Sequence, residues 1–425
     1  MLVTVVLCFL LLIAVSMPIA FSMGIASLIG MIWTKDFLMV IPQRIFTGMD
    51  SFVLLAVPFF ILAGELMEAG GISHRLMRLA DSLVGHLRGG LGMVAVVAEI
   101  FFSGISGSTS ADTAAMASMM SPAMKKSGYP SERVAAIICA SCGMGILVPP
   151  CIAMVVYGIV ANVSIAALFA AGFLPAFFMA SLIMVLIYIQ ARKLRLTPKP
   201  RSSVKEIGFA FKDSLLALFM PIIIFGGILG GVTTATEAAV IAVVYGLIVG
   251  IFLYREVSWK RVGQILINTT CVTGIVLFLI GVASVFSWLL TLQQVPQILA
   301  DGMLKISSHP GVFLLLVNFA FLFIGAVLEG IPALIMFTPI FLPIAQKLGI
   351  DPVHFGILLI ANMGIGVFLP PVGANFFIAC SVAGVPITQG AKALFPYLVV
   401  MFATIIIITF WPGLVLFLPK LLLSQ

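Results

Sequence analysis

Long runs of apolar residues, separated by short polar segments, cover almost the whole chain. A helix needs about 20 apolar residues to cross the hydrocarbon core of a bilayer. We expect membrane-spanning helices near residues 50–70, 133–160, 165–191, 214–232, 236–254, 263–290, 353–384 and 393–418. The pattern therefore predicts an all-α polytopic membrane protein with a single membrane domain, residues 1–425.

Three further apolar stretches do not have the form of one simple span. The stretch 2–34 is longer than one crossing requires, and Pro18 either kinks it or divides it into two pieces. Residues 91–124 and 312–346 each carry a polar or Gly-rich break in the middle. The first arm, 91–102, rises only about 18 Å at 1.5 Å per residue, which is short of a core roughly 30 Å thick. We therefore predict two re-entrant hairpins, each entering and leaving by one face.

Basic residues alternate with uncharged turns along the chain. Arg and Lys stand at both ends of the first hairpin, near residues 192–212 and near 255–261, whereas the turns between these loops are uncharged. Cytoplasmic loops carry an excess of Lys and Arg, so the first hairpin is predicted to start and end in the cytoplasm. Segment 291–311 has Lys305 as its single basic residue. The second hairpin is therefore predicted to approach from the opposite side.

The two halves of the chain repeat each other in one register. GMGILVPP at 143–150 matches GIGVFLPP at 364–371, an offset of 364 − 143 = 221. The same offset pairs Gly104 with Gly325 without a gap. Because the hairpins are predicted on opposite faces, the repeats are inverted, a recurring plan of secondary transporters. The predicted parts are a first repeat (about 1–192, hairpin 91–124, broken helix 133–160), a basic cytoplasmic linker (193–213) and a second repeat (about 214–425, hairpin 312–346, broken helix 353–384).

A duplication kept for packing alone does not explain why both copies retain helix breakers. Unpaired backbone groups at bilayer depth cost several kcal/mol each. Such backbone survives where it lines a cavity or coordinates something. The breaks therefore favour a transporter over a purely structural repeat.

Composition excludes several other classes of protein. The chain is 62% hydrophobic and 9% charged, against about a quarter charged in soluble domains. The net charge of +7 does not indicate nucleic acid, because the basic residues are confined to short segments between apolar runs. Cys139 and Cys142 form a CxxC motif, but no second pair stands nearby to complete a metal site.

No catalytic motif stands out in the sequence. It lacks the phosphate-cradling GxxxxGK[ST] of an ATP-driven pump and the HExxH of a metalloprotease. We therefore expect no enzyme activity. A channel also uses re-entrant hairpins, but opposed hairpins with helix breaks fit alternating access better.

Several motifs resemble one family of permeases along the whole chain. They are PFFILAGELMEAGG at 58–71, SGISGSTSADTAAM at 103–116, GMGILVPP at 143–150, TTATEAA at 233–239, FLFIGAVLEGIPALIMFTPIFLP at 321–343 and GIGVFLPPVGANFF at 364–377. Together they resemble the large membrane subunit (DctM/SiaM-like) of the tripartite ATP-independent periplasmic (TRAP) transporters, with the nearest likeness in the sialic acid branch.

This resemblance implies a fold, a mechanism and partners. It implies an elevator-type transporter of the bacterial inner membrane, driven by a sodium gradient. It also implies a small four-helix membrane subunit, expected here as a separate chain, and a periplasmic substrate-binding protein. The substrate would be an organic acid anion, with sialic acid (N-acetylneuraminate) as the first candidate.

Two or more sodium ions are expected where helices unwind. Backbone carbonyls freed by a break, helped by hydroxyls, can hold sodium in broken-helix transporters. Proline lacks an N–H, so carbonyls one turn earlier lose their donors. We place one sodium at Ser103, Ser106, Gly145, Val148 and Pro150, and the repeat offset predicts a second at Gly325, Val327, Gly366, Leu369 and Pro371. The alternative is that these glycines only permit close helix packing.

Polar residues near the same breaks are the candidate substrate contacts. They are Ser108, Thr109, Asp112 and Asn375. Asp112 is a functional candidate because an ionised group is costly at this depth, although it could instead cap the second hairpin arm. Asn362 is an alternative contact, but an interhelical hydrogen bond is its commoner role.

A second function remains open on the sequence. The chain could be a sodium- or proton-coupled di- or tricarboxylate symporter of similar architecture that works without a binding protein. Co-purification with a small four-helix subunit would distinguish the two.

Overall fold

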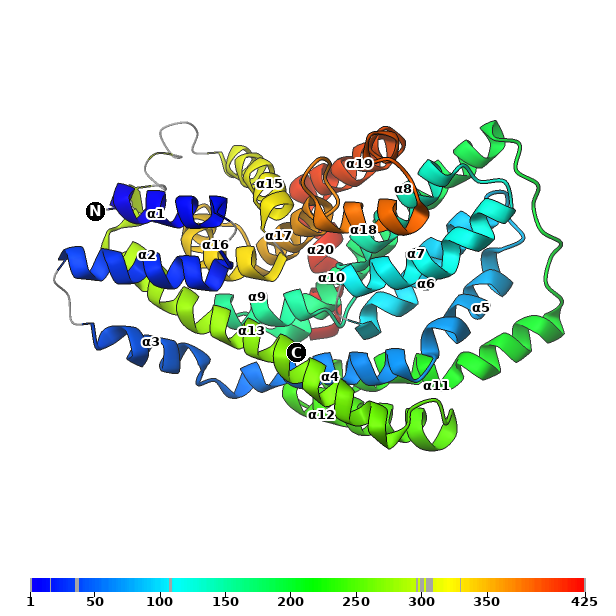
Figure 1. Cartoon of the computed structure of the whole chain (residues 1–425), viewed down its shortest axis with the longest axis horizontal. Helices are drawn as coiled ribbons and strands as arrows, with labels where there is room; N and C mark the ends of the chain where they lie inside the picture. Colours follow the sequence, from blue (N-terminus) through cyan, green and yellow to red (C-terminus); the bar gives the residue numbers. More distant parts are fainter. Residues whose placement is uncertain are drawn as a thin grey trace.

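The part of the chain that the structure describes is built entirely from helices. The structure is a computed structural model that describes residues 2–15, 17–34, 38–106, 109–295, 297–298, 302, 309–328 and 330–423. Every regular element in these residues is helical, which confirms the all-α class (Figure 1). Within these described residues, eight helical segments are long and apolar enough to cross a membrane.

A first group of helices packs around α13, which is the longest described helix at 34 residues. Helix α13 contacts α2, α3 and α4, while α12 packs on α4 and α11. We call these helices the first group. Its members are α1 (Leu2–Ala14), α2 (Ile19–Thr34), α3 (Val40–Met49), α4 (Ala56–Ala69), α11 (Val204–Leu229), α12 (Ala235–Leu247) and α13 (Trp259–Leu292).

A second group contains the two hairpins and the two broken helices. Helices α6, α7, α8 and α18 pack against one another, and so do α15, α16 and α17. Helix α5 (Ile72–Val84) packs on α6 and on α11, so it joins the two groups. The members of the second group are α6 (Gly90–Ser106), α7 (Thr109–Lys126), α8 (Ser131–Gly145), α9 (Ile152–Ala161), α10 (Ile165–Lys193), α15 (Pro310–Val327), α16 (Gly330–Lys347), α17 (Pro352–Gly366), α18 (Ala374–Ala383), α19 (Ile387–Phe410) and α20 (Pro412–Leu423).

The hairpin arms are longer than the sequence indicated. Helix α6 continues past Phe102 through the glycine at 104 to Ser106, because glycine is tolerated inside a helix at a modest cost. Its 17 residues rise about 26 Å, close to a full crossing. Helices α15 and α16 are long enough to count among the eight candidate spans. Helix length therefore does not test the re-entrant geometry, which stays a prediction.

Each broken helix passes through the same kind of turn. After α8, Leu147 N donates to Met144 O at 3.0 Å and Val148 N donates to Gly145 O at 2.8 Å. After α17, Phe368 N donates to Ile365 O at 3.0 Å and Leu369 N donates to Gly366 O at 2.9 Å. These bonds are related by the offset of 221 residues. The backbone repeat thus extends to its hydrogen bonds.

Several element boundaries differ from the sequence expectation. Stretch 2–34 forms two packed helices, α1 and α2. The run 393–418 is two helices rather than one span, since α19 ends at Phe410 and α20 starts at Pro412, whose missing N–H cannot continue a helix. The linker 193–213 is partly helical, because a Ser203–Glu206 capping box starts α11 inside it.

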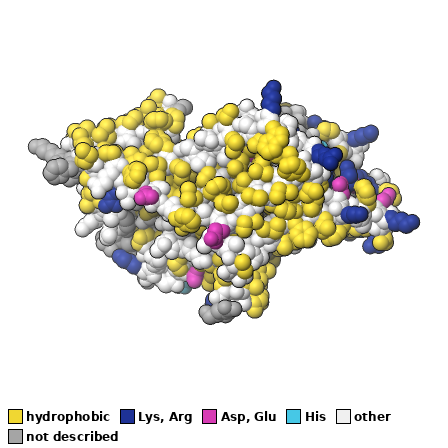
Figure 2. Space-filling view, turned by 90° about the horizontal axis from the view of Figure 1, so that it is seen from below, with side chains coloured by type: hydrophobic (Ala, Val, Ile, Leu, Met, Phe, Trp, Pro, Cys, Tyr) yellow, Lys and Arg dark blue, Asp and Glu magenta, His cyan; other side chains and the backbone are white. Residues whose placement is uncertain are grey.

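The surface supports a membrane setting. Figure 2 shows apolar side chains over the middle of one face, with most of its Lys and Arg at the end where Figure 1 places α5 and the start of α11. A basic end on an apolar body is what the positive-inside rule predicts for the cytoplasmic side.

The two repeats meet in a tight contact between α9 and α17. Tyr157 is fully buried, and its hydroxyl donates to Pro352 O at 2.7 Å. Its ring lies against Gly356, where an added Cβ would come within 2.2 Å of the ring carbon Cε1. A buried ring that is also hydrogen-bonded has little freedom to move. The close approach of the repeats here therefore requires a glycine.

Replacing Gly356 by Ala should lower the stability of the purified protein by about 1–3 kcal/mol, the usual cost of overpacking. The measurement is the thermal unfolding midpoint in detergent. Gly274→Ala is the matched control, because nothing lies within 4 Å of that position on α13; this change should be neutral or stabilise the helix by up to about 1 kcal/mol. Equal midpoints for the two variants would contradict the packing argument.

Candidate functional site

The first hairpin meets the first broken helix at Ser103 and Gly145. The Ser103 hydroxyl donates to the Gly145 carbonyl at 2.6 Å. That carbonyl also accepts from Val148 N at 2.8 Å. Ser103 is buried, so a hydroxyl and a carbonyl face each other inside the protein. The structure thus brings together two of the residues predicted for the first sodium site.

The other residues of this set lie close in the chain to the same turn. Val148 and Pro150 are buried. At Gly104, an added Cβ would come within 2.6 Å of the carbonyl oxygen of Pro149, so the hairpin and the turn are in close backbone contact. Ser106 ends α6, but its side chain lies outside the described residues.

The second hairpin and the second break are in close backbone contact. An added Cβ on Gly366 would lie 2.7 Å from the carbonyl carbon of Gly325. The Leu369 carbonyl accepts from Gly373 N at 2.8 Å. Val327 and Pro371 are exposed and Leu369 is partly buried, whereas Val148 and Pro150, the counterparts of Leu369 and Pro371, are buried. The second predicted set is thus more open than the first.

Buried side-chain amides form a hydrogen-bond network about one turn before the second break. Asn362 donates to Asn318 Oδ1 at 2.8 Å and to Leu358 O at 2.8 Å. Asn318 in turn donates to Thr409 Oγ1 at 2.8 Å. The interpretation of Asn362 as an interhelical hydrogen-bonding residue is confirmed.

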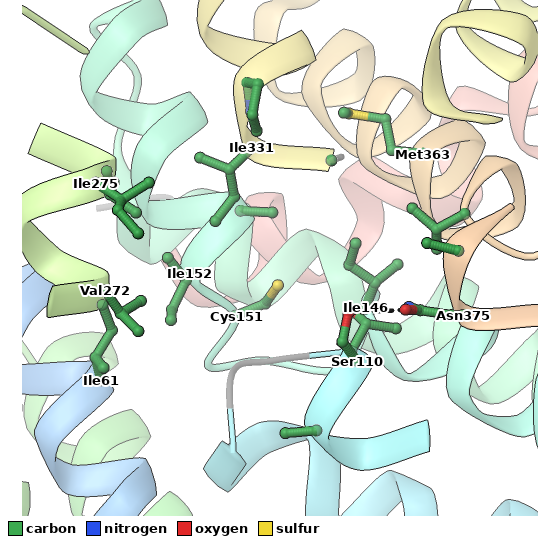
Figure 3. A pocket seen from close by; sticks show the side chains of 18 of the residues that line it. Ile61, Ser110, Ile146, Cys151, Ile152, Val272, Ile275, Ile331, Met363 and Asn375 are labelled. Atoms are coloured by element: carbon green, nitrogen blue, oxygen red, sulfur yellow. Dashed lines mark hydrogen bonds between the residues drawn. The ribbon is translucent and has the colours of Figure 1, made fainter. Parts of the chain in front are cut away.

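A cavity of about 400 Å³ lies between the two helix groups (Figure 3). Ile61, Val272 and Ile275 form its wall on the first group, and Ile331 and Met363 lie on the second group. Its size suits a small organic molecule. The start of α7, the turn between α8 and α9, and the start of α18 all reach it. The cavity therefore adjoins both breaks.

The polar lining of the cavity comes from neutral side chains of the second group. Thr109 and Asn375 line it, as predicted for substrate contacts. Ser110 also lines it and donates to Asn375 Oδ1 at 2.7 Å, so the first hairpin is tied to the second broken helix. Ser110 was not among the predicted contacts. It belongs to the polar run SGSTS, but the sequence pattern does not determine which residues of that run face the cavity.

The remaining substrate candidates have other positions. Asp112 is buried in the first turn of α7 and is not part of the cavity lining. Ser108 lies outside the described residues. Among the described lining residues the charged side chains are Glu65 and Glu68, both on α4. Outside the cavity, Glu237 forms a capping box with Thr234 at the start of α12.

Known transporter permeases are similar to this chain over nearly its whole length. The family model for "Tripartite ATP-independent periplasmic transporter, DctM component" matches residues 6–414. The chain is 38% identical to the C4-dicarboxylate TRAP transporter large permease protein DctM of Pseudomonas aeruginosa, covering 94% of each chain. It is 37% identical to the sialic acid TRAP transporter large permease protein SiaM of Vibrio cholerae, over 96% of each. It is 35% identical to the 2,3-diketo-L-gulonate TRAP transporter large permease protein YiaN of Escherichia coli, over 95% of each.

A solved structure shares the fold. The YdaH transporter of Alcanivorax borkumensis superposes with a TM-score of 0.65 at 15% identity, covering 88% of this chain and 87% of that one. The matching family and the relatives are transporter permeases and not enzymes. With eight candidate spans, the chain is a multi-pass protein of the inner membrane. It belongs to the DctM component family of the tripartite ATP-independent periplasmic transporters.

Proposed function

We propose that this chain is the large membrane subunit of a sodium-coupled uptake system for an organic acid anion, with sialic acid as the first candidate. The observation that carries the proposal is the cavity between the two helix groups, which adjoins both helix breaks and the start of α7. A substrate held there would lie beside the helix breaks that both repeats share.

The lining of the cavity suits an anion held by neutral donors. Thr109, Ser110 and Asn375 supply hydroxyl and amide groups. Asn375 stands at the start of α18, where the helix dipole favours negative charge. The substrates in the names of the three relatives, a C4-dicarboxylate, sialic acid and 2,3-diketo-L-gulonate, are all organic acid anions. This common chemistry supports the substrate class more strongly than any one substrate.

The first break supplies oxygen atoms of the kind that bind sodium. Sodium is held by oxygen ligands, and Ser103 Oγ lies 2.6 Å from the Gly145 carbonyl oxygen in a buried setting. The carbonyls of Val148 and Pro150 follow in the same turn. The second break offers Gly325, Gly366 and Leu369, without a hydroxyl. The first set fits a sodium ion better than the second.

The same arrangement supports an elevator-type movement. In the proposed cycle the second group carries substrate and sodium past the first group, and α5 connects the two. A separate small membrane subunit and a periplasmic substrate-binding protein would complete the system. The alternative is a sodium- or proton-coupled symporter of di- or tricarboxylates that needs no binding protein.

In proteoliposomes with the small subunit, uptake should require both an inward sodium gradient and the binding protein. A panel of sialic acid, dicarboxylates and keto acids would identify the substrate. Replacing sodium by potassium should reduce the initial rate to background. Equal uptake in potassium would contradict sodium coupling, and full uptake without the binding protein would favour the alternative symporter.

Replacing Ser103 by Ala should raise the sodium concentration for half-maximal uptake several-fold, because a ligand and a hydrogen bond worth about 1 kcal/mol are lost. Ser118→Ala is the matched control, since this serine is exposed on α7 and bonds only Ala115 O of its own helix. The control should titrate as the wild type. An unchanged sodium titration for the Ser103 variant would remove that residue from the site.

Replacing Asn375 by Ala should raise the KM for the substrate about tenfold, because a buried polar contact is lost. The sodium dependence of thermal stability should remain. Ser110→Ala and the double variant complete a mutant cycle on the 2.7 Å hydrogen bond. A KM equal to that of the wild type in all three variants would exclude this end of the cavity from the substrate site.

A further inference from the structure

A carboxyl group that the sequence analysis did not single out lies beside the first break. Glu99 stands on α6, one turn before Ser103, and is fully buried. Its Oε2 accepts from the Cys142 thiol at 3.6 Å. Its Oε1 is buried and has no hydrogen-bond partner among the described residues. No described Lys or Arg forms an ion pair with it.

The unpaired oxygen points at the place where the hairpin meets the break. An added Cβ on Gly145 would lie 2.4 Å from Glu99 Oε1 and 2.9 Å from Ser103 Oγ. Both side-chain oxygens therefore converge on one side of Gly145. The Gly145 carbonyl oxygen is in turn 2.6 Å from Ser103 Oγ. A carboxylate, a hydroxyl and a carbonyl thus share one buried neighbourhood.

Charge determines what such a group of oxygens can hold. A carboxylate removed from water without a partner is strongly unfavourable, whereas a carboxylate beside a bound cation is stabilised by the attraction that the low local dielectric strengthens. The three oxygens are Glu99 Oε1, which accepts no hydrogen bond from the described residues, Ser103 Oγ and the Gly145 carbonyl oxygen. Oxygen ligands of this kind are what a small hard cation prefers. We propose that Glu99 supplies the negative charge that binds sodium at the first break, and this assignment rests on the proposed sodium coupling.

The Glu99 carboxyl group has no equivalent in the second repeat. The offset of 221 residues pairs Glu99 with Ala320 and Ser103 with Ile324. A sodium ion at the first break would be neutralised by the Glu99 carboxylate, whereas the second half has an alanine, Ala320, at the equivalent position. The first ion then binds more tightly and at lower sodium concentration. Glu99 thereby sets the order in which the two sites fill.

The test compares two uncharged replacements of similar size in the full chain. Glu99→Gln keeps a polar head and Glu99→Leu is apolar. Both should raise the sodium concentration for half-maximal thermal stabilisation of the purified protein, and for half-maximal uptake, by about tenfold or more. Glu132→Gln is the control, because it removes the same charge from the first turn of α8; it should titrate as the wild type.

The outcomes separate the two proposals. A wild type that responds equally to sodium and potassium contradicts sodium coupling itself. A sodium-specific wild type with Glu99→Gln and Glu99→Leu within about twofold of it overturns the role of Glu99, which is then a neutral packing group. A similar loss of sodium affinity in the Gln and Leu variants identifies charge as the cause, whereas a loss in the Leu variant alone assigns Glu99 a hydrogen-bonding role and overturns the proposal. If one variant does not fold, the other decides.

Discussion

The structure depends on how broken backbone is satisfied inside an apolar interior. Each turn between half-helices closes through the same short bonds, from Val148 N to Gly145 O and from Leu369 N to Gly366 O. Buried backbone groups without such partners would cost several kcal/mol each. Once these turns are closed, residues beside both of them, Ile146 and Val367 among them, line the cavity. The hairpins pack where they do because each must cover one turn.

The two turns share a backbone but differ in their surroundings. The first is buried and faces a hydroxyl and a carboxyl from α6. The second is partly exposed, with Val327 and Pro371 at its edge, and its polar support comes from the amide pair Asn318–Asn362, a turn below the break. A duplicated unit has thus kept its main-chain geometry while its side chains diverged. Divergence of this kind permits two ion sites of unequal affinity without a second fold.

The sequence predicted the helical class, the repeat register and the location of both breaks, because apolar run length and Pro-Pro pairs are local signals. The division at Pro412 was missed, since composition stays apolar across it. Ser103 and Gly145 are in contact, as their places at a hairpin tip and at a helix break suggested, and their role in binding sodium stays a prediction. Ser110 and Glu99 were missed for a different reason. Their importance depends on which face of a helix meets a neighbour, and that is decided by packing between segments far apart in the chain.

The charges around the cavity bear on how substrate could move. The acidic side chains Glu65 and Glu68 belong to α4 of the first group, whereas the neutral donors Ser110 and Asn375 belong to the second. An organic anion would be repelled by the first wall and held by the second. In the proposed cycle, movement of the second group would therefore carry the anion with it and leave the acidic wall behind. A sodium ion near Gly145 would travel on the same side as the anion, so that attraction between them would act throughout the movement.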